Sequence, residues 1–99
     1  MSKICKIWLD DIRTPPLGYE QCFSVNEAKK RIAEAEKNGE TIEVIDCDHD
    51  LGDYATDGGD GIKLLDWLVE RKTLYPITLH TMNPVGRQNM LSTIERYWK

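Results

Sequence analysis

The stretch DCDHDLGD, residues 46–53, holds four aspartates and one histidine within eight residues. Carboxylates this close together repel one another unless a cation or hydrogen-bond donors lie among them. The five residues before the stretch, TIEVI, are typical of a β-strand. The acidic group therefore follows a predicted strand. It is either a solvated loop or a site for a metal ion or for acid–base chemistry.

Two other predicted strands also end in polar, reactive side chains. The apolar run ICKIWL stops at Asp10 and Asp11, and the run YPITLHT ends at His80 and Thr81. Strands here alternate with helical patterns, which favours a parallel sheet covered by helices. In such a sheet all strands end at one edge, and that edge is where ligands bind. We therefore expect the three polar groups to converge.

The elements that must position these groups follow from hydrophobic periodicity and capping signals. The predicted strands are residues 4–9, 19–23 (a possible edge strand), 41–48 and 75–81, and the predicted helices are residues 24–39, 61–72 and 84–98. Ser24 and Glu27 form a capping box, and Gly39 is a left-handed cap. Asp60 is expected to cap the second helix, and Pro84 suits the first turn of the third.

Each of the last two helices has one apolar face that we expect to be buried. The second presents Ile62, Leu65, Leu68 and Val69, with Trp67 on its flank, and the third presents Met90, Leu91, Ile94 and Trp98. The chain has 99 residues, 40% of them hydrophobic, so we expect residues 1–99 to form a single domain with one modest core.

The charge distribution limits the classes of partner. The formal net charge is −4, which argues against an extensive surface for double-stranded nucleic acid. Residues 40–70 carry ten acidic and one basic side chain, whereas residues 71–99 carry five basic and one acidic. This division suits a site where a cation and a phosphate meet, and it is equally compatible with a plain surface dipole.

The remaining composition argues for a reduced, cytoplasmic protein without a membrane partner. The three cysteines are odd in number and have no CxxC spacing, so buried thiols are expected rather than disulfides or a zinc site. Lys3 and Lys6 interrupt the N-terminal apolar run, so no signal peptide is expected. No stretch has the roughly 20 apolar residues of a membrane span.

Asp10, Asp11 and Asp48 are candidate ligands for Mg²⁺ or Mn²⁺, because hard divalent cations prefer carboxylate oxygens. Asp50 either joins them or folds the turn after it through an Asx hydrogen bond. Asp46 has the opposite strand parity to Cys47, and a structural role is expected for it. The alternative for the whole group is a solvated acidic loop.

His49 and His80, the only histidines, both fall at strand ends. A histidine pair can open a cyclic phosphate without a metal, one ring activating water and the other protonating the leaving oxygen. Together with Asp48 they are the candidate catalytic residues. The alternative is that each histidine is only a hydrogen-bonding partner.

Four residues are candidates for binding a phosphate. Thr81 and Asn83 offer short donors before the last helix, whose N-terminal N–H groups favour an anion. Arg87, in its first turn, can bind phosphate through two hydrogen bonds or pair with the acidic region. Arg13 follows the acidic pair and can orient either a carboxylate or a phosphate.

These residues resemble the receiver domain of response regulators. By that resemblance Asp10 and Asp11 match the metal-binding acids, Asp48 the phosphoacceptor aspartate and Thr81 the hydroxyl residue. The sequence departs from a receiver in two ways. It has no helix after its first strand, and no fifth strand with the receiver's lysine follows.

A closer resemblance covers nearly the whole chain. The motifs IWLDDIRTPP, DHDLGD, GIKLLDWL and LHTMNPVGRQNM are similar, in this order, to the cyclic-phosphate processing receiver family, a trimmed receiver relative linked to RNA repair. The resemblance implies an α/β, receiver-like (flavodoxin-like) three-layer fold of about four mostly parallel strands and three helices.

The function implied is metal-assisted, phosphoesterase-like processing of a cyclic phosphate. The expected substrate and partner is a 2′,3′-cyclic phosphate RNA end or a cyclic nucleotide. Two alternatives stay open. The same edge could bind such a ligand without turnover, or Asp48 could accept a phosphoryl group as in a signalling receiver.

Overall fold

The computed structural model describes residues 3–98, and the predicted elements form in the predicted order. The strands are β1 (Ile4–Leu9), β2 (Glu20–Cys22), β3 (Thr41–Cys47) and β4 (Ile77–Leu79), and the helices are α1 (Val25–Lys37), α2 (Ile62–Arg71) and α3 (Pro84–Tyr97), with a short 3₁₀ helix, η1 (Gly52–Thr56), after β3. No helix in this part of the chain is long and apolar enough to cross a membrane.

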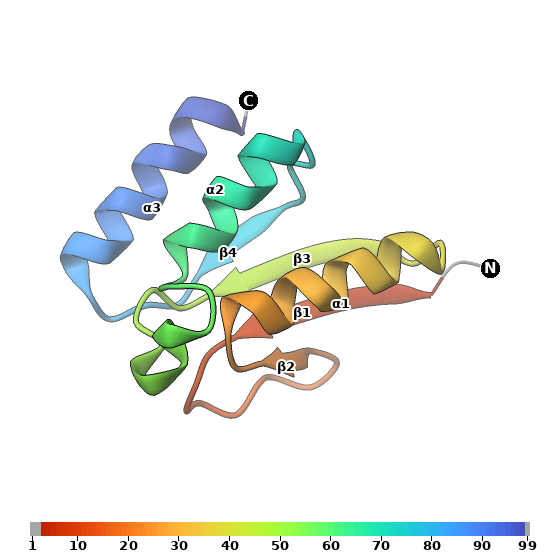
Figure 1. Cartoon of the computed structure of the whole chain (residues 1–99), viewed down its shortest axis with the longest axis horizontal. Helices are drawn as coiled ribbons and strands as arrows, with labels where there is room; N and C mark the ends of the chain where they lie inside the picture. The colour runs from red at the N-terminus through yellow and green to blue at the C-terminus, as the bar shows by residue number, and fades with distance from the viewer. Residues whose placement is uncertain (1–2, 99) are drawn as a thin grey trace.

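One four-stranded sheet organises the molecule (Figure 1). Its order is β2-β1-β3-β4, and every neighbouring pair is parallel. The prediction of a receiver-like α/β fold with four strands and three helices is confirmed. Because all strands run the same way, their C-terminal ends meet at one edge of the sheet.

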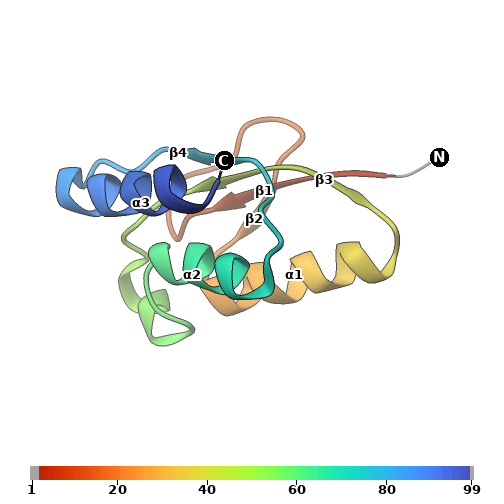
Figure 2. The ribbon, with the colours of Figure 1, turned by 90° about the horizontal axis from the view of Figure 1, so that it is seen from above.

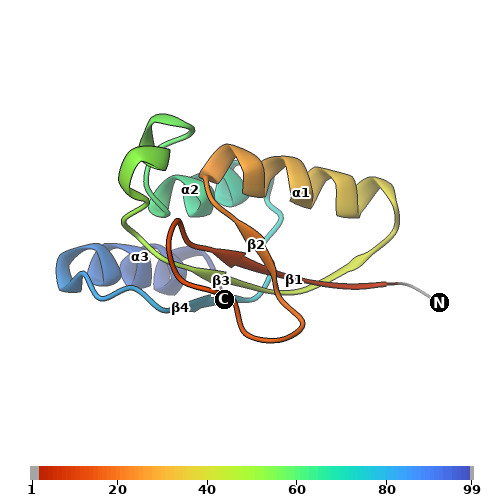
Figure 3. The ribbon, with the colours of Figure 1, turned by 90° about the horizontal axis from the view of Figure 1, so that it is seen from below.

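The layering differs from the three-layer arrangement expected above. Figures 2 and 3 show α1 and α2 on one side of the sheet and α3 beside its β4 edge, and no helix in residues 3–98 covers the other face, which leaves two layers. The reason lies between β1 and β2, where residues 10–19 form a loop instead of the helix that would cover the other face. We call the face without helices the open face.

The core lies between the sheet and the helices. Every second residue in β1 and at the end of β3 points into it, together with one face of α1 and one face of α2. The fully buried members are Cys5, Ile7, Leu9, Val25, Ala28, Ile32, Ala35, Ile45, Cys47, Leu51, Leu64, Leu65, Leu68 and Met90. All three cysteines are free and buried, as predicted, and burial raises the pKa of each thiol, that of Cys22 to about 12.

Helix ends and helix faces follow the sequence signals with two corrections. Ser24 caps α1 by accepting the N–H of Glu27 at 3.0 Å, and Gly39 has a φ of +71° just after the helix. Asp60 does not cap α2, because its carboxylate accepts the N–H of Leu51 at 3.2 Å. The buried face of α2 includes Leu64, which the sequence analysis left out.

The buried face of α2 also leaves its edge residues only half-buried. Ile62 and Val69 are half-buried, and on α3 Leu91, Ile94 and Trp98 are half-buried as well. Both helices therefore have a narrower apolar face than predicted. On α3 only Met90, of the four predicted residues, is fully buried.

Glu36 joins α1 to the segment that follows α2. It accepts hydrogen bonds from Arg71, at 2.5 Å, and from the hydroxyl of Tyr75. Burial raises the pKa of Glu36, but the bonds from Tyr75 and Arg71 outweigh this effect and hold the pKa below its usual value of 4.5. Burial and the same bond raise the pKa of Tyr75 to about 12.

We predict that Glu36→Gln lowers the free energy of unfolding by about 1 kcal/mol near neutral pH, because it removes a charge-assisted pair of bonds. The folded-state pKa lies below the unfolded one. The contribution is therefore present above about pH 4.5 and is lost as the pH falls through the folded value. Urea unfolding at about pH 7 and about pH 3 measures it. Glu34→Gln, on the exposed side of α1, is the control, and an equal loss at both pH values would contradict the prediction.

Candidate active site at the strand ends

Backbone hydrogen bonds hold the strand ends together at the C-terminal edge of the sheet. The N–H of Asp48 donates to the carbonyl of Leu9 at 2.9 Å, and the N–H of His80 donates to the carbonyl of Cys47 at 3.0 Å. The residues that follow β1, β3 and β4 are thus neighbours. This is the convergence that the sequence predicts.

A pocket of about 290 Å³ opens at this edge, and we call it the acidic pocket. Its lining residues are Asp10, Asp11, Ile12, Arg13, Asp48, Asp50 and Gly52. All four predicted metal-binding aspartates therefore face one space. Ligand atoms of Asp10, Asp48 and His80 lie within 4.8 Å of one another, close enough to share a metal ion.

Asp10 is the buried anchor of the pocket, with 1% of its surface exposed. Its Oδ1 accepts the N–H groups of Ile12 at 2.8 Å and Arg13 at 2.9 Å, and its Oδ2 lies 2.9 Å from Nε2 of His80. Burial alone raises the pKa of Asp10, but these donors together hold it below its ordinary value. Asp10 is therefore an ionised carboxylate in a fixed orientation.

Asp11 has the opposite tendency. Burial raises its pKa, and the negative charges of Asp10, Asp48 and Asp53 raise it further. Gly52 lies so close to the carboxylate of Asp11 that a Cβ built on Gly52 would be 2.6 Å from Oδ2 of Asp11. Burial is thus the main cause of the raised pKa, and the neighbouring carboxylates contribute negative charge that favours a cation in the pocket.

Asp50 lines the same pocket but is also held by its neighbours. Its carboxylate lies 2.8 Å from Nδ1 of His49 and accepts the side-chain amide of Asn83 at 3.0 Å. These bonds, that from His49 first, lower the pKa of Asp50. Its carboxylate thus bonds to two side chains and not to the backbone of the turn after it, so the Asx turn considered from the sequence does not form, and metal binding by Asp50 stays a prediction.

His80 lies on the open face, clamped on three sides. Its Nδ1 is 2.7 Å from Oδ1 of Asp46, its Nε2 is 2.9 Å from Asp10, and its ring stacks on Trp8 with centroids 3.7 Å apart. Asp46 is the functional neighbour that the sequence analysis missed. Its strand parity, shared with Asp48 and with its partner Trp8 on β1, is the signal that could have identified it.

His49 belongs to a different group from His80. Its ligand atoms cluster with those of Asp50 and Asp60, and its ring packs on Gly86, where a Cβ would lie 2.4 Å from the ring carbon Cγ. A glycine is also required at position 61, where a Cβ would lie 1.9 Å from the carbonyl oxygen of Asp48. The two histidines thus have separate partners, and this arrangement does not pair them across one substrate.

The four predicted phosphate-binding residues do not all lie at the acidic pocket. Arg13 lines the acidic pocket and donates from Nη1 to the carbonyl of His80 at 2.9 Å, whereas Arg87 is exposed on the first turn of α3. Thr81 accepts the N–H of Asn83 at 3.1 Å, and Asn83 caps α3 by accepting the N–H of Gly86 at 3.0 Å. The N–H groups of Gly86 and Arg87 both donate to Asn83, and Pro84 has no N–H, so few donors at the start of α3 remain for an anion.

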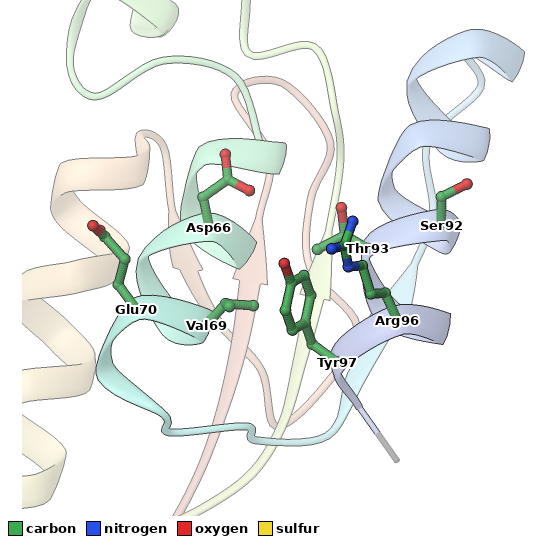
Figure 4. A pocket seen from close by; sticks show the side chains of 7 residues that line it. All are labelled: Asp66, Val69, Glu70, Ser92, Thr93, Arg96 and Tyr97. Carbon is green, nitrogen blue, oxygen red and sulfur yellow. The ribbon is translucent and has the colours of Figure 1, made fainter.

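A larger cavity, of about 450 Å³, lies elsewhere, between the C-terminal halves of α2 and α3 (Figure 4). Its lining residues are Asp66, Val69, Glu70, Ser92, Thr93, Arg96 and Tyr97. It is open and of mixed charge, and Arg96 lies over the ring of Tyr97. The smaller acidic pocket has the convergent ionisable groups and is the better candidate for chemistry.

Comparison with protein-family models places the chain. Residues 5–96 match the family described as the cyclic-phosphate processing receiver domain, and the four sequence motifs all fall within this range. The chain belongs to this family. Comparisons with curated proteins and with solved structures found no match. The family name associates the domain with cyclic-phosphate processing.

We predict that Asp11→Asn stabilises the protein without divalent cations by about 0.5 kcal/mol near neutral pH. The pKa of Asp11 is higher in the folded than in the unfolded chain, so its ionisation opposes folding above about pH 3.8. Urea unfolding in EDTA measures the gain, which should vanish at lower pH. Asp66→Asn on α2 is the matched control. Destabilisation by Asp11→Asn would show that Asp11 is a structural hydrogen-bonding partner.

Proposed function

We propose that the protein binds Mg²⁺ or Mn²⁺ in the acidic pocket and hydrolyses a cyclic phosphate there. The substrate would be a 2′,3′-cyclic phosphate RNA end or a cyclic nucleotide. Water adds to phosphorus, one ring P–O bond breaks, and the released oxygen takes a proton to become a hydroxyl. The observation that carries the proposal is the convergence of four carboxylates on one pocket, in a chain of the cyclic-phosphate processing family.

The donor set fits a hard divalent cation. Asp10, Asp11 and Asp48 offer carboxylate oxygens from two adjacent strand ends, and Asp50 offers another from the following turn. A pocket of about 290 Å³ leaves space for coordinated water and a phosphate beside an ion. Burial is the main reason for the raised pKa of Asp11, and the negative charges of Asp10, Asp48 and Asp53 add to it; a cation in the pocket would offset these charges. When bound, such an ion would polarise a phosphate oxygen.

Arg13 is the best-placed residue for holding the phosphate. Its backbone N–H orients Asp10 while its guanidinium, anchored through Nη1, lies at the pocket wall. A guanidinium has five donors, so others stay available for phosphate oxygens. Thr81 and Asn83 stabilise the turn between β4 and α3 through their hydrogen bonds. Arg87, on the first turn of α3, adds a positive charge that would contact a longer RNA end.

His80 is better suited to positioning than to proton transfer in this arrangement. Both ring nitrogens are engaged by carboxylates, so protonating a leaving oxygen would first require one of these bonds to break. As it stands, the ring fixes the orientation of Asp10, and Asp46 and Trp8 fix the ring. Partners of this kind commonly set the affinity of a metal site.

A binding module is the second candidate, and the engagement of His80 favours it. Without a free acid at the pocket, the protein could hold a cyclic phosphate and not open it. The third candidate, phosphorylation of Asp48, is testable by intact mass after treatment with acetyl phosphate.

We predict that 2′,3′-cyclic nucleotides and a cyclic-phosphate RNA oligonucleotide are opened with Mg²⁺ or Mn²⁺ and not in EDTA. Asp48→Asn should lower kcat/KM at least about 100-fold, equivalent to about 2.7 kcal/mol of transition-state stabilisation, because it removes a charged ligand. Asp66→Asn should leave the rate unchanged. Product analysis by chromatography of the monophosphate measures both.

Two outcomes of that assay would contradict hydrolysis. Micromolar binding without any product would identify a binding module. Ring opening that survives EDTA would place the chemistry on protein side chains alone.

We predict that His80→Ala and Asp46→Ala each weaken Mn²⁺ binding about ten-fold, because Asp10 loses its fixed orientation. Titration calorimetry with Mn²⁺ and kcat measured at saturating metal separate this role from proton transfer. A kcat that falls more than about 100-fold in His80→Ala with an unchanged Kd for Mn²⁺ would instead identify His80 as a general acid or base.

A further inference from the structure

Two exposed aromatic rings stack on each other near the acidic pocket. Phe23 is 37% exposed and Tyr54 is 44% exposed, and their ring centroids lie 5.5 Å apart with 27° between the planes. Neither residue belongs to the core of the protein. The stacked pair presents a partly exposed apolar surface at the C-terminal edge of the sheet, which is the edge where such folds bind ligands.

Backbone contacts place this pair beside the pocket. Phe23 directly follows Cys22, whose carbonyl accepts the N–H of Asp10 at 3.1 Å. Tyr54 lies two residues after Gly52, which lines the pocket and lies close to the carboxylate of Asp11. Consecutive Cα atoms are about 3.8 Å apart, so the Tyr54 Cα lies within about 8 Å of the pocket lining. That reach is comparable with the span from phosphate to base in one nucleotide.

The pair flanks the pocket on the side away from His80. The strand order β2-β1-β3-β4 puts Phe23 next to β1 on one side and His80 next to β3 on the other. In Figure 1 the loop after β3 lies beside the end of β2 and the start of α1. A ligand with its phosphate among the aspartates would therefore meet the aromatic pair with its base.

The loop that carries Tyr54 is fixed to α1. The carboxylate of Asp57 accepts bonds from the hydroxyl of Ser24 at 2.7 Å and from the side-chain amide of Asn26 at 3.0 Å. The N–H of Asn26 donates to the carbonyl of Asp57 at 3.1 Å. These bonds join the end of the Tyr54 loop to the residues just after Phe23, so the two rings are held before any ligand arrives.

We propose that Phe23 and Tyr54 form a nucleobase subsite, on which the base of the cyclic-phosphate nucleotide stacks. The proposal rests on the proposed function and adds to it which part of the nucleotide the protein recognises besides the phosphate, namely an unpaired base. Stacking on aromatic rings is tolerant of base identity. It also suits a net charge of −4, which does not favour binding to a duplex along its phosphates.

The test compares substrates with and without a base. Kinetics with Mn²⁺ are measured for adenosine 2′,3′-cyclic phosphate, for an RNA oligonucleotide ending in a cyclic phosphate, and for glycerol 1,2-cyclic phosphate, which has the same ring and no base. Tyr54→Ala and Phe23→Ala should each raise KM about ten-fold for the two base-bearing substrates and leave the base-free one unchanged.

Two variants make the comparison specific. Tyr54→Phe keeps an aromatic face and should retain wild-type KM. Tyr97→Ala removes a ring that is 42% exposed on α3, outside the acidic pocket, and should change nothing. An equal loss on the base-free ring, or no loss with adenosine, would overturn the subsite.

A binding arm separates this proposal from the hydrolytic one. The Kd values of adenosine 3′-monophosphate and of inorganic phosphate are measured with Mn²⁺ for each variant. A ten-fold weaker Kd for the nucleotide alone in Tyr54→Ala would support the subsite even if no substrate is turned over. If both ligands weaken equally, or if the nucleotide binds no more tightly than inorganic phosphate, the proposal is wrong.

Discussion

Mutual repulsion among carboxylates gathered at one sheet edge is the constraint on which this structure depends. Parallel pairing of β1 with β3 brings Asp10, Asp11 and Asp48 together, and chain connectivity gives no way to separate them. Part of the repulsion is offset around Asp10, where two backbone N–H groups and the ring of His80 stabilise the ionised form. At Asp11 the charges of Asp10, Asp48 and Asp53 are not offset in this way, and they add to the effect of burial in raising its pKa.

The open face of the sheet allows His80 to contact Asp10 and so to offset part of this repulsion. A helix after β1 would cover Trp8, but here His80 stacks on that ring. Tyr19 packs against it in a T-shaped arrangement with the ring centroids 6.0 Å apart. Trp8 is left with 8% of its surface exposed, so a histidine and a loop residue replace helical packing. The replacement positions an ionisable ring against Asp10. Loss of the helix and the unusual partners of His80 are thus parts of one arrangement.

Hydrophobic periodicity was enough to predict the strands, the parallel sheet and the meeting of its polar ends, because each depends on local pattern and on chain connectivity. It could not predict the pairing of His80 with Asp46, which needs the register between β3 and β4. Nor could it predict that Gly61 and Gly86 admit no side chain, because both limits come from residues distant in sequence. Asp60 illustrates the same point. Its position predicts a helix cap, but its carboxylate instead accepts the N–H of Leu51 across the loop.

Under the proposed function, binding of a cation and binding of a phosphate to this pocket would be coupled. A phosphate entering among the ionised aspartates without a cation would add charge of the same sign, while a cation held there would gain further ligands from the phosphate. Such coupling is reciprocal, so each ligand raises the affinity of the pocket for the other by the same factor. Stacking of a base on the Phe23–Tyr54 pair would not require the cation, because stacking does not depend on the charge in the pocket. A nucleotide could therefore be held by its base before the cation and the phosphate complete the site.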